Sequence, residues 1–462
     1  MPDFDRVLIL DFGSQYTQLI ARRVREFGVH SEIHPCTVSA DDDRFSNIKA
    51  LILSGGPNSV LDSEKPKFDE RWLDRKIPIL GICYGMQLLG LHYGGEVVRS
   101  TTREYGRAEF RVVDECELCV GLPRDESSQV WMSHGDHVDS VPEGFYRIGS
   151  SEALPIAAMA HKERPIFALQ FHPEVAHTTC GATLIENFLF RIAKVKKEWD
   201  AAHFIQQSVQ AISEQVPSNA QVVCGLSGGV DSTVAAKLVH QAIGDRLHCL
   251  FVDNGLLRKD EADQVEATLG PKGLGLPFYR IDAREDFLSE LSGVSDPEQK
   301  RKIIGRVFIE VFEREAKRFD NVQFLVQGTL YPDVIESVSP HGGPSVTIKS
   351  HHNVGGLPEK MNLKLIEPLR DLFKDEVRKF GTEMGIPHEL LWRHPFPGPG
   401  LAVRVLGPVS EDRLSILREA DAIFIDEIRR AGLYDDIWQA FAVLLPVQSV
   451  GVMGDERTYE NA

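Results

Sequence analysis

The sequence predicts an α/β protein with two doubly wound domains, each built on a largely parallel sheet, and a smaller α+β region at its C-terminal end. Short apolar strands alternate with stretches of helical spacing, which is the order of elements in parallel α/β sheets. This alternation pauses and starts again near residue 200. A chain of 462 residues has room for roughly two to four domains.

The first domain is expected over residues 5–199. Its predicted elements, in order, are the strand Arg6–Leu10, the helix Thr17–Phe27, the strands Ala50–Leu53 and Ile77–Ile82, the short alternating segments Glu109–Val113, Gln129–Met132, Ala157–Ala160 and Ile166–Phe171, and the helix Ala182–Lys194. The segments after Gly95 alternate apolar and polar residues, which is typical of half-buried strands. The charged stretch Lys194–Asp200 is expected to be the linker.

The second domain is expected over residues 200–394 and the C-terminal region over 395–462. The second domain's predicted elements are the strand Gln221–Leu226, the helix Asp231–Ile243, the strands Leu247–Val252 and Phe278–Ile281, the helix Lys300–Phe319 and the strand Val322–Val326. The stretch Ser337–Thr347 is rich in Ser, Pro and Gly and is expected to be a mobile loop. In the C-terminal region we expect strands at Ala402–Leu406 and Ser449–Met453 and helices at Glu411–Ala431 and Ile437–Leu445.

Composition limits the classes of function. The net charge is −17, so broad binding to the phosphates of nucleic acid is not expected. No run of about 18 apolar residues occurs, and the N-terminal residues lack the basic segment of a secretory signal. Seven scattered cysteines do not make a disulfide framework. We therefore expect a cytoplasmic protein that binds neither membrane nor nucleic acid.

A candidate nucleophile, Cys83, lies between two glycines at the end of an apolar strand. The string Gly81-Ile82-Cys83-Tyr84-Gly85 has the G-x-nucleophile-x-G form of a nucleophile elbow, with Cys in place of Ser. The glycines permit a sharp strand-to-helix turn, and the following helix favours a thiolate and can donate backbone N–H groups to an oxyanion. The alternative is a buried cysteine in an ordinary strand-turn-helix.

His172 and Glu174 are the candidate base and its partner. Both lie at the end of the apolar strand that begins near Ile166. Two residues apart in extended backbone, their side chains point to the same face. The carboxylate can therefore hold one tautomer of the imidazole while the other ring nitrogen faces a thiol. With an elbow cysteine upstream, this pair favours a Cys-His-Glu triad over a structural histidine.

On the elbow and the H-P-E string, residues 5–199 resemble the class I glutamine amidotransferases. The resemblance implies that Cys83 is the nucleophile, His172 the general base and acid, and Glu174 the residue that orients the imidazole. It also implies attack on the γ-amide of glutamine, release of ammonia and hydrolysis of a glutamyl thioester. The residues that it implies for the oxyanion and for glutamine are Gly55, Gly56, Tyr84, Gln87, Ser133, His134, Gly135 and Asp136.

A candidate phosphate loop follows the strand Gln221–Leu226. Its residues are Ser227, Gly228, Gly229, Val230, Asp231, Ser232 and Thr233. Small residues at a helix N-terminus let backbone N–H groups close around phosphate oxygens, and no Walker-type string occurs. The S-G-G-V-D-S string resembles the pyrophosphate loop of the N-type ATP pyrophosphatases. That resemblance implies cleavage of ATP between the α- and β-phosphates, adenylation of a carbonyl oxygen, Mg²⁺ positioned by Asp231, and Asp253 near the nucleotide.

Three further strings resemble the GMP synthetase family, and the resemblance covers essentially the whole chain. They are Lys300–Gly305, Gln327–Ser337 and Ile348–Pro358. The resemblance implies glutamine, ATP with Mg²⁺, and XMP, whose 2-oxygen is adenylated before ammonia displaces AMP. The residues singled out for XMP or for a lid are Arg301, Asp333, Glu336, Lys349 and His351. Asp333 and Glu336 are acidic groups suited to Mg²⁺, whereas Arg301 has the alternative of a solvated helix face.

Two rival classes share parts of this pattern. Glutamine-dependent NAD synthetase shares S-G-G-x-D-S but typically carries a Glu-Lys-Cys glutaminase, and the H-P-E string argues against it. A nucleotide-binding regulatory module would not need a complete Cys-His-Glu set. Cys116 and Cys119 form a C-x-x-C, but a zinc site needs a second pair and no redox helix is predicted after them. No function is therefore expected at that pair.

The C-terminal end departs from the GMP synthetase family. Its members usually continue for several dozen residues past the equivalent of Ala462, in a segment that completes the dimer interface and part of the XMP pocket. The family resemblance implies a homodimer, which the shorter C-terminus puts in question. We expect the chain to keep both sets of catalytic residues and to make GMP poorly.

Overall fold

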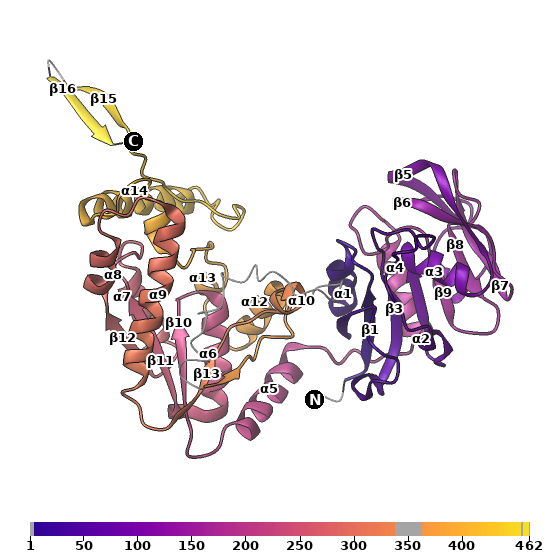
Figure 1. The fold of residues 1–462 in the computed structure, drawn as a ribbon, viewed down its shortest axis with the longest axis horizontal. Helices are drawn as coiled ribbons and strands as arrows, with labels where there is room; N and C mark the ends of the chain where they lie inside the picture. The colour runs from indigo at the N-terminus through magenta and orange to yellow at the C-terminus, as the bar shows by residue number, and fades with distance from the viewer. Residues whose placement is uncertain (1–3, 338–362, 454–455, 462) are drawn as a thin grey trace. The chain divides into compact units, whose positions relative to one another are not determined.

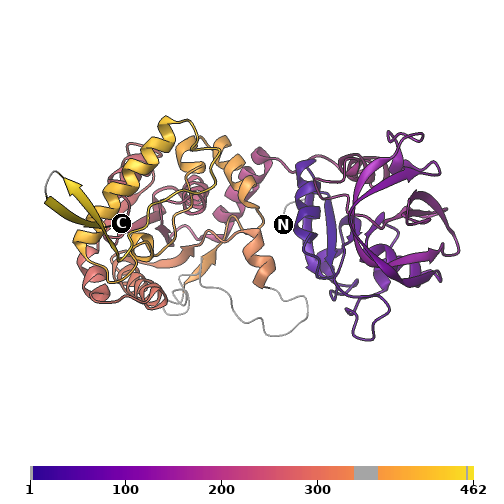
Figure 2. The same cartoon turned by 90° about the horizontal axis from the view of Figure 1, so that it is seen from above.

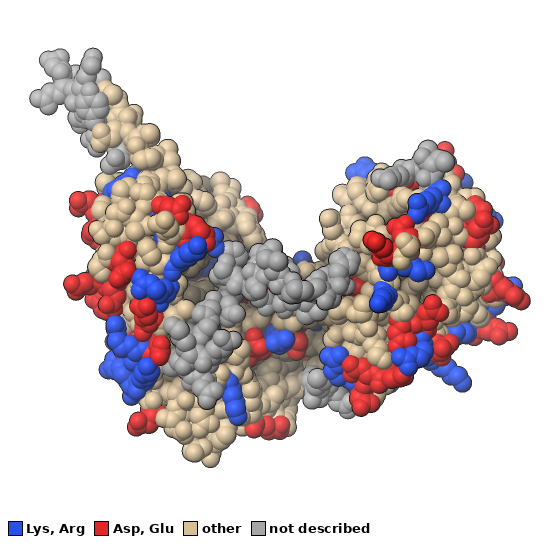
Figure 3. All heavy atoms as spheres, in the orientation of Figure 1, with Lys and Arg blue, Asp and Glu red and all other residues tan. Residues whose placement is uncertain are grey.

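The computed structural model describes residues 4–337, 363–453 and 456–461. Contacts divide the described residues into two compact units, residues 4–203 with 335–337 and residues 204–334 with 363–461 apart from 454–455. Each unit is described by itself (Figure 1). On the face drawn in Figure 3, acidic and basic side chains are interspersed over both units, in keeping with the excess of acidic residues in the sequence.

The first unit is built on a nine-stranded mixed sheet in the order β2-β1-β3-β4-β9-β8-β7-β5-β6. The strands are β1 Arg6–Asp11, β2 His30–Pro35, β3 Ile48–Leu53, β4 Ile79–Ile82, β5 Glu96–Val112, β6 Ser128–Ser140, β7 Phe145–Ser151, β8 Ala158–His161 and β9 Ile166–Leu169. Neighbouring strands are parallel from β2 through β1, β3 and β4 to β9. From β9 through β8, β7 and β5 to β6 they are antiparallel. Figure 2 shows the long antiparallel strands beside the parallel ones. The predicted parallel sheet is confirmed, with an antiparallel extension.

The first unit also contains seven helical segments among its described residues. They are α1 Thr17–Glu26, η1 Asp43–Phe45, α2 Arg71–Asp74, α3 Tyr84–His92, η2 Glu117–Cys119, α4 Gly181–Glu186 and η3 Asn187–Ile192. Val7, Leu8, Ile9 and Leu10 of β1 are all fully buried, as expected for a strand covered on both faces. The stretch predicted as a linker packs on this unit, because Val195 and Trp199 are buried and the Trp199 N–H donates to Gly28 O at 2.9 Å.

The second unit contains a five-stranded parallel sheet in the order β12-β11-β10-β13-β14. Its strands are β10 Gln221–Leu226, β11 Leu247–Asp253, β12 Phe278–Asp282, β13 Val322–Val326 and β14 Lys364–Ile366. Its helical segments are α5 Ala201–Gln215, α6 Val230–Ile243, η4 Gly244–Arg246, α7 Glu261–Leu269, α8 Arg284–Leu291, α9 Pro297–Ala316, α10 Tyr331–Ser337, α12 Lys374–Glu383, α13 His388–Leu391, η5 Gly400–Val403 and α14 Glu411–Arg430. This confirms the second doubly wound sheet.

The direction of winding reverses beside β10. From β10 the chain adds β11 and then β12 on one side, and afterwards β13 and β14 on the other. In open α/β sheets, ligands bind at the carboxyl ends of the strands where the order reverses. The ends of β10 and β13 are therefore the expected ligand-binding edge of this sheet.

Two predicted elements of the C-terminal region are wrong. Residues 402–406 are not a strand. Their backbone turns around the buried Lys300 ammonium of α9, which donates hydrogen bonds to the carbonyl oxygens of Ala402 (3.0 Å), Val405 (2.7 Å) and Gly407 (2.7 Å). Residues 437–445 form neither a helix nor a strand. The one regular pairing in this segment is an isolated bridge between Leu444 and Val405, and Ala440 and Leu444 are buried. The strand predicted at 449–453 is found as β15 Gln448–Met453, paired with β16 Glu456–Asn461.

Candidate active sites

Cys83 sits on a strained turn between β4 and α3. Its backbone has φ 52° and ψ −102°, a left-handed conformation that non-glycine residues rarely adopt and that costs about 1–3 kcal/mol. A Cβ added at Gly81 would lie 2.7 Å from Leu89 Cδ1, and one at Gly85 would lie 2.5 Å from Leu53 O. Both glycines are therefore required for the turn, and the nucleophile elbow expected from the sequence is formed.

His172 and Glu174 lie beside Cys83 and form a buried triad with it. His172 Nδ1 is 2.7 Å from Glu174 Oε1, and the imidazole and the Cys83 side chain are near enough for Cys83 to raise the pKa of His172. The exposed fractions of Cys83, His172 and Glu174 are 4%, 2% and 1%. The charges of the His172 imidazole and the Glu174 carboxylate therefore interact with little screening by water. Burial alone would lower the pKa of His172, but the Glu174 carboxylate and the Cys83 thiol outweigh it and raise that pKa to about 10.

This raised pKa predicts a pH-dependent stability. A histidine whose folded pKa lies above its ordinary value of 6.5 contributes stability that is complete below about pH 6.5 and is lost as the pH rises through about 10. We expect the free energy of unfolding of Glu174→Gln at pH 7 to be lower than that of wild type by on the order of a few kcal/mol. This difference in unfolding free energy should become smaller as the pH approaches 10. Urea unfolding of both proteins across this range measures it. Glu152→Gln, at an exposed site of the same unit, is the control, and a constant gap would contradict the prediction.

The loop that carries His172 and Glu174 is fixed by its backbone. The His172 N–H donates to Trp131 O at 3.0 Å, and Thr178 Oγ1 donates to His172 O at 2.6 Å. Arg23 of α1 donates through Nε to Glu174 O at 3.0 Å. The ring of Tyr16 also meets the imidazole edge-on, with centroids 5.0 Å apart. The triad is thus held from α1, β6 and the loop before α4.

Gly181 at the start of α4 lies against this loop. A Cβ there would be 1.9 Å from Pro173 O, so we expect Gly181→Ala to push the 172–174 segment out of place. The overpacking costs about 1–3 kcal/mol, and a shift near 1 Å lowers the glutaminase kcat about 100-fold. Steady-state glutaminase assays check this. Gly305→Ala, where nothing lies within 4 Å of the added Cβ, is the matched control, and wild-type kcat in Gly181→Ala would disprove the account.

Gln170 is a site residue that the sequence analysis did not single out. Its side chain is fully buried, and Nε2 lies 3.8 Å from Cys83 Sγ. It precedes His172 by two residues, so the same alternation that pairs His172 with Glu174 places it on that face. That spacing was the signal that could have identified it.

The oxyanion loop expected at Gly55 and Gly56 lies against the triad. A Cβ at Gly55 would be 3.1 Å from His172 Cε1, and one at Gly56 would be 2.8 Å from Phe12 O. The Gly85 N–H of the elbow donates to Ser54 O at 3.2 Å. The structure therefore brings this loop, the elbow and the imidazole together, and leaves no room for a side chain at either glycine.

The residues expected to bind glutamine gather on the other side of Cys83. The Cys83 thiol donates to Ser133 O at 3.5 Å, and Gln87 Nε2 donates to Asp136 O at 2.7 Å. His134 is buried, with Nε2 3.1 Å from Glu104 Oε2. Burial, and to a smaller degree His137, lowers the pKa of His134 to about 4. Its ring is thus neutral near pH 7.

In the second unit, the loop from Ser227 to Thr233 joins β10 to α6 at the edge where the strand order reverses. Gly228 has φ +69°, and a Cβ there would lie 2.9 Å from Val265 Cγ2. Gly229 caps α6. The hydroxyls of Ser227 and Ser232 lie 3.1 Å apart, and Thr233 Oγ1 donates to Gly229 O at 2.8 Å. The loop is closed by its own hydroxyls, with the first backbone N–H groups of α6 at its mouth.

Asp231 of this loop is paired with a residue that the sequence analysis missed. Lys374, at the start of α12, donates through Nζ to both Asp231 oxygens at 2.6 and 2.5 Å. Gly328, after β13, also packs on Asp231, since its added Cβ would lie 3.2 Å from Asp231 Cβ. Arg393 donates to Gly228 O at 3.2 Å. Two cations therefore flank the loop, from positions far along the chain.

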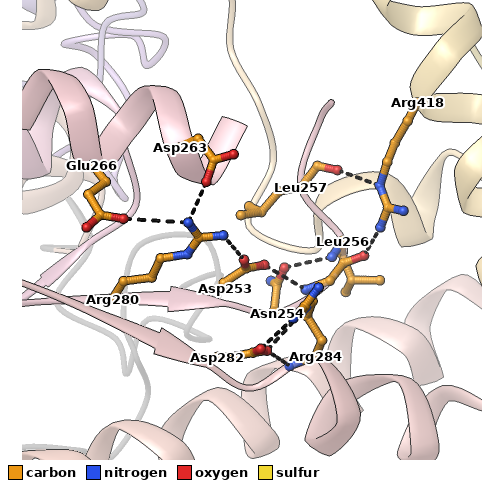
Figure 4. A network of polar contacts seen from close by, with 11 residues as sticks. Asp253, Asn254, Leu256, Leu257, Asp263, Glu266, Arg280, Asp282, Arg284 and Arg418 are labelled. Carbon is orange, nitrogen blue, oxygen red and sulfur yellow. Dashed lines mark hydrogen bonds and ion pairs between the residues drawn. The ribbon is translucent and has the colours of Figure 1, made fainter. Parts of the chain in front are cut away.

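Asp253 ends β11, the parallel neighbour of β10, so it lies on the same edge of the sheet. Its carboxylate accepts from Arg280 Nη2 at 2.8 Å and from the Gly255 N–H at 3.3 Å. Arg280 is held in turn by Asp263 and Glu266 (Figure 4). Arg418 of α14 donates to the carbonyls of Gly255 and Leu257. Asp253 thus anchors a rigid loop.

The remaining expected residues are only partly described. Asp333 Oδ2 accepts from the Leu330 N–H at 2.9 Å at the start of α10. Arg301 pairs with Glu298 on α9 at 3.6 Å. Glu336 lies on the α10 backbone, and Lys349 and His351 lie outside the described residues. In the described part of the chain, no group of three or more His, Cys, Asp or Glu side chains is arranged to hold a metal ion.

A class I glutamine amidotransferase joined to an ATP pyrophosphatase is the class of protein that these two sites define. The glutamine amidotransferase class-I family model matches residues 8–192, the NAD synthase model residues 200–299 and the GMP synthase C terminal domain model residues 426–462. GMP synthase [glutamine-hydrolyzing] of Oleidesulfovibrio alaskensis is 57% identical over 457 residues, and that of Nitratidesulfovibrio vulgaris is 58% identical over 456. Each alignment covers 99% of this chain and 88% of the relative. The chain belongs to the glutamine-hydrolysing GMP synthase family.

Glutamine-dependent synthesis of GMP with the use of ATP is accordingly its function, and the chain is a ligase of purine nucleotide biosynthesis. The NAD synthetase alternative is not supported, because the relatives that match nearly the whole chain are GMP synthases. Among solved structures, a glutamine amidotransferase from Thermotoga maritima is 20% identical, with a TM-score of 0.35, and covers 42% of this chain and all of that one. No described helix is long and apolar enough to cross a membrane.

Proposed function

We propose that Cys83, His172 and Glu174 hydrolyse glutamine. His172 takes the thiol proton as the Cys83 sulfur attacks the γ-amide carbon, and it gives that proton to the departing ammonia. Water then attacks the thioester and gives a proton to His172. Glutamate is released, and His172 passes the proton to the Cys83 sulfur, which restores the thiol. Glu174 keeps Nδ1 protonated through its 2.7 Å bond. Gly56 and the Tyr84 amide would receive the oxyanion, and Gln87 and the 133–136 segment would hold the rest of glutamine.

We infer that the loop 227–233 binds the phosphates of ATP. The observation that carries this proposal is its place at the strand-order reversal, with α6 behind it and Lys374 and Arg393 beside it. Lys374 would leave Asp231 for the β- and γ-phosphates when ATP binds. The XMP 2-oxygen then attacks the α-phosphorus, pyrophosphate leaves, and ammonia later displaces AMP at carbon 2. Asp253 would hold the nucleotide-side loop.

The chemistry of Asp231 fits Mg²⁺ that arrives with ATP. Mg²⁺ is usually held by one or two carboxylates together with substrate phosphates and water. Asp231 is a partly exposed carboxylate at the phosphate loop, and among the described residues its ion-pair partner is the ammonium of Lys374. Asp333 is already committed to a backbone N–H, so we assign the first contact to Asp231. When bound, Mg²⁺ would neutralise charge on the transferring phosphate.

The acceptor site, assembly and location are further proposals. We assign XMP or lid contacts to Arg301, Asp333, Glu336, Lys349 and His351, following the family strings. A homodimer through the C-terminal region is supported by exposed apolar side chains there, with Trp438 71% and Ile423 64% exposed. Static light scattering of the purified chain tests it. All seven cysteines are free, which supports a reducing compartment such as the cytoplasm.

Exchange of labelled pyrophosphate into ATP tests the adenylation proposal. We expect exchange that requires XMP and Mg²⁺ and needs no glutamine, because adenylation precedes amination. Exchange with nicotinic acid adenine dinucleotide in place of XMP would instead support the NAD synthetase chemistry. Glutamine hydrolysis, measured in the same preparation, reports the first site separately, so that failure of one site is distinguished from failure of the other.

A further inference from the structure

The Cys116–Cys119 pair of the first unit folds into a fixed turn. Cys116 precedes η2 and Cys119 ends it, and the Cys119 N–H donates to Cys116 O at 3.1 Å. The Asn187 side chain donates to Leu118 O at 2.9 Å and to Val120 O at 2.8 Å, and thereby clamps the turn from η3. Each thiol shifts the pKa of the other, so the two side chains face the same small space. The sequence predicts no function for this pair, yet the fold holds both cysteines on one fixed turn.

The two thiols differ in access and in acidity. Cys116 is half-buried, whereas the other six cysteines, all among the described residues, are buried. The hydrogen bond from Cys119 lowers the pKa of Cys116, while the same bond and burial raise the pKa of Cys119. Since the thiolate is the nucleophile in disulfide exchange, Cys116 is the thiol that reacts first.

A pocket lies beside the turn, and both cysteines are among the residues that line it. It has a volume of about 480 Å³ and is lined by Cys116 and Cys119 together with Glu115 and Arg124, which form an ion pair at 2.5 Å. Cys180, behind the turn, interacts electrostatically with Cys119, and burial raises its pKa to about 11. Cys180 does not line this pocket, whereas Cys119 lines it together with Cys116, so Cys119 is the partner thiol that the pocket and the turn favour.

We propose that Cys116 and Cys119 form a thiol modification site, at which a low-molecular-weight disulfide such as glutathione disulfide closes the pair to an intramolecular disulfide. The Cys116 thiolate attacks one sulfur of glutathione disulfide, forming a mixed disulfide and releasing one glutathione thiolate. Cys119, after losing its proton, attacks the Cys116 sulfur and releases the second glutathione. The two cysteines lose two electrons and two protons, and two glutathione molecules carry them.

Thiol mapping of the full-length chain tests the proposal. A Cys83→Ala parent removes the catalytic thiol from the readout, and wild type mapped peptide by peptide gives the same information. After incubation with glutathione disulfide, acid quenching and alkylation of the unfolded, unreduced protein, we expect the parent to lose two alkylatable thiols and the 116–119 peptide to lose two hydrogens. Cys119→Ser should stop with one glutathione on Cys116. Cys116→Ser should take up none, and Cys180→Ser, the matched control, should behave as the parent.

Three outcomes would overturn it. Both thiols could remain alkylatable in the parent after incubation, the mixed disulfide on Cys116 could persist although Cys119 is present, or Cys180→Ser could block closure. The last outcome would make Cys180 the resolving thiol instead. Far-UV circular dichroism and the thermal midpoint of each variant establish that folded proteins are compared.

Discussion

Replacing Cys83 with alanine is expected to abolish GMP formation from glutamine and to leave GMP formation from ammonium salts intact. The substitution removes the nucleophile of the triad, and such losses lower kcat by at least about 10⁴-fold. Free ammonia does not need the first site, because it is the species that the glutaminase would deliver. Steady-state GMP production with each nitrogen source, at saturating XMP and ATP, measures both activities.

The control for this prediction is Cys36→Ala. Cys36 is buried near the start of the same unit, and its thiol donates to Lys67 O at 3.6 Å, outside the triad. We expect Cys36→Ala to retain both activities, with a stability loss typical of a small truncation in a core. If Cys83→Ala still used glutamine, another nucleophile would have to be sought. If it also lost the ammonia reaction, the two sites would not be separable as proposed.

The parts of both sites that lie close together in sequence could be predicted from the sequence. The elbow glycines around Cys83 and the alternation of His172 with Glu174 are local patterns with a direct geometric meaning. The same is true of the loop after β10. Gln170 follows the same alternation. Its side chain is uncharged, however, and no neighbouring residue forms a recognisable catalytic pair with it, so the sequence does not distinguish it from an ordinary strand residue.

Residues brought in from distant elements could not be predicted. Lys374 lies 143 positions from Asp231, and Arg393 lies 165 positions from Gly228. Each is one of many cations in the sequence, and only the folded sheet selects it. The C-terminal errors have a related cause. Residues 402–406 have a strand-like composition, but the buried Lys300 ammonium organises their carbonyls, and a tertiary contact of this kind overrides local propensity.

Replacing Asp231 with asparagine is expected to abolish the adenylation of XMP in the second unit. Glutamine hydrolysis in the first unit should be unaffected. Asp231 is the carboxylate at the phosphate loop, and we assign it both the Lys374 contact and the first contact to Mg²⁺. Loss of several kcal/mol of charge stabilisation in the transition state corresponds to about 10³-fold in XMP-dependent pyrophosphate exchange. The Asp231–Lys374 pair is partly exposed, with Lys374 at 40%, so its loss costs at most about 1 kcal/mol of stability.

Lys374→Met supplies the complementary test, because it removes the cation and keeps the carboxylate. We expect it to raise the KM for ATP as well as to slow exchange, since the ammonium contacts phosphate both before and during transfer in this proposal. Lys379→Met, an exposed lysine on the same helix, is the matched control and should leave exchange unchanged. Glutamine hydrolysis should persist in all three variants. Exchange within about tenfold of wild type in Asp231→Asn would show that Asp231 does not hold the metal–phosphate contact, and the carboxylate would then be a structural partner of Lys374 alone.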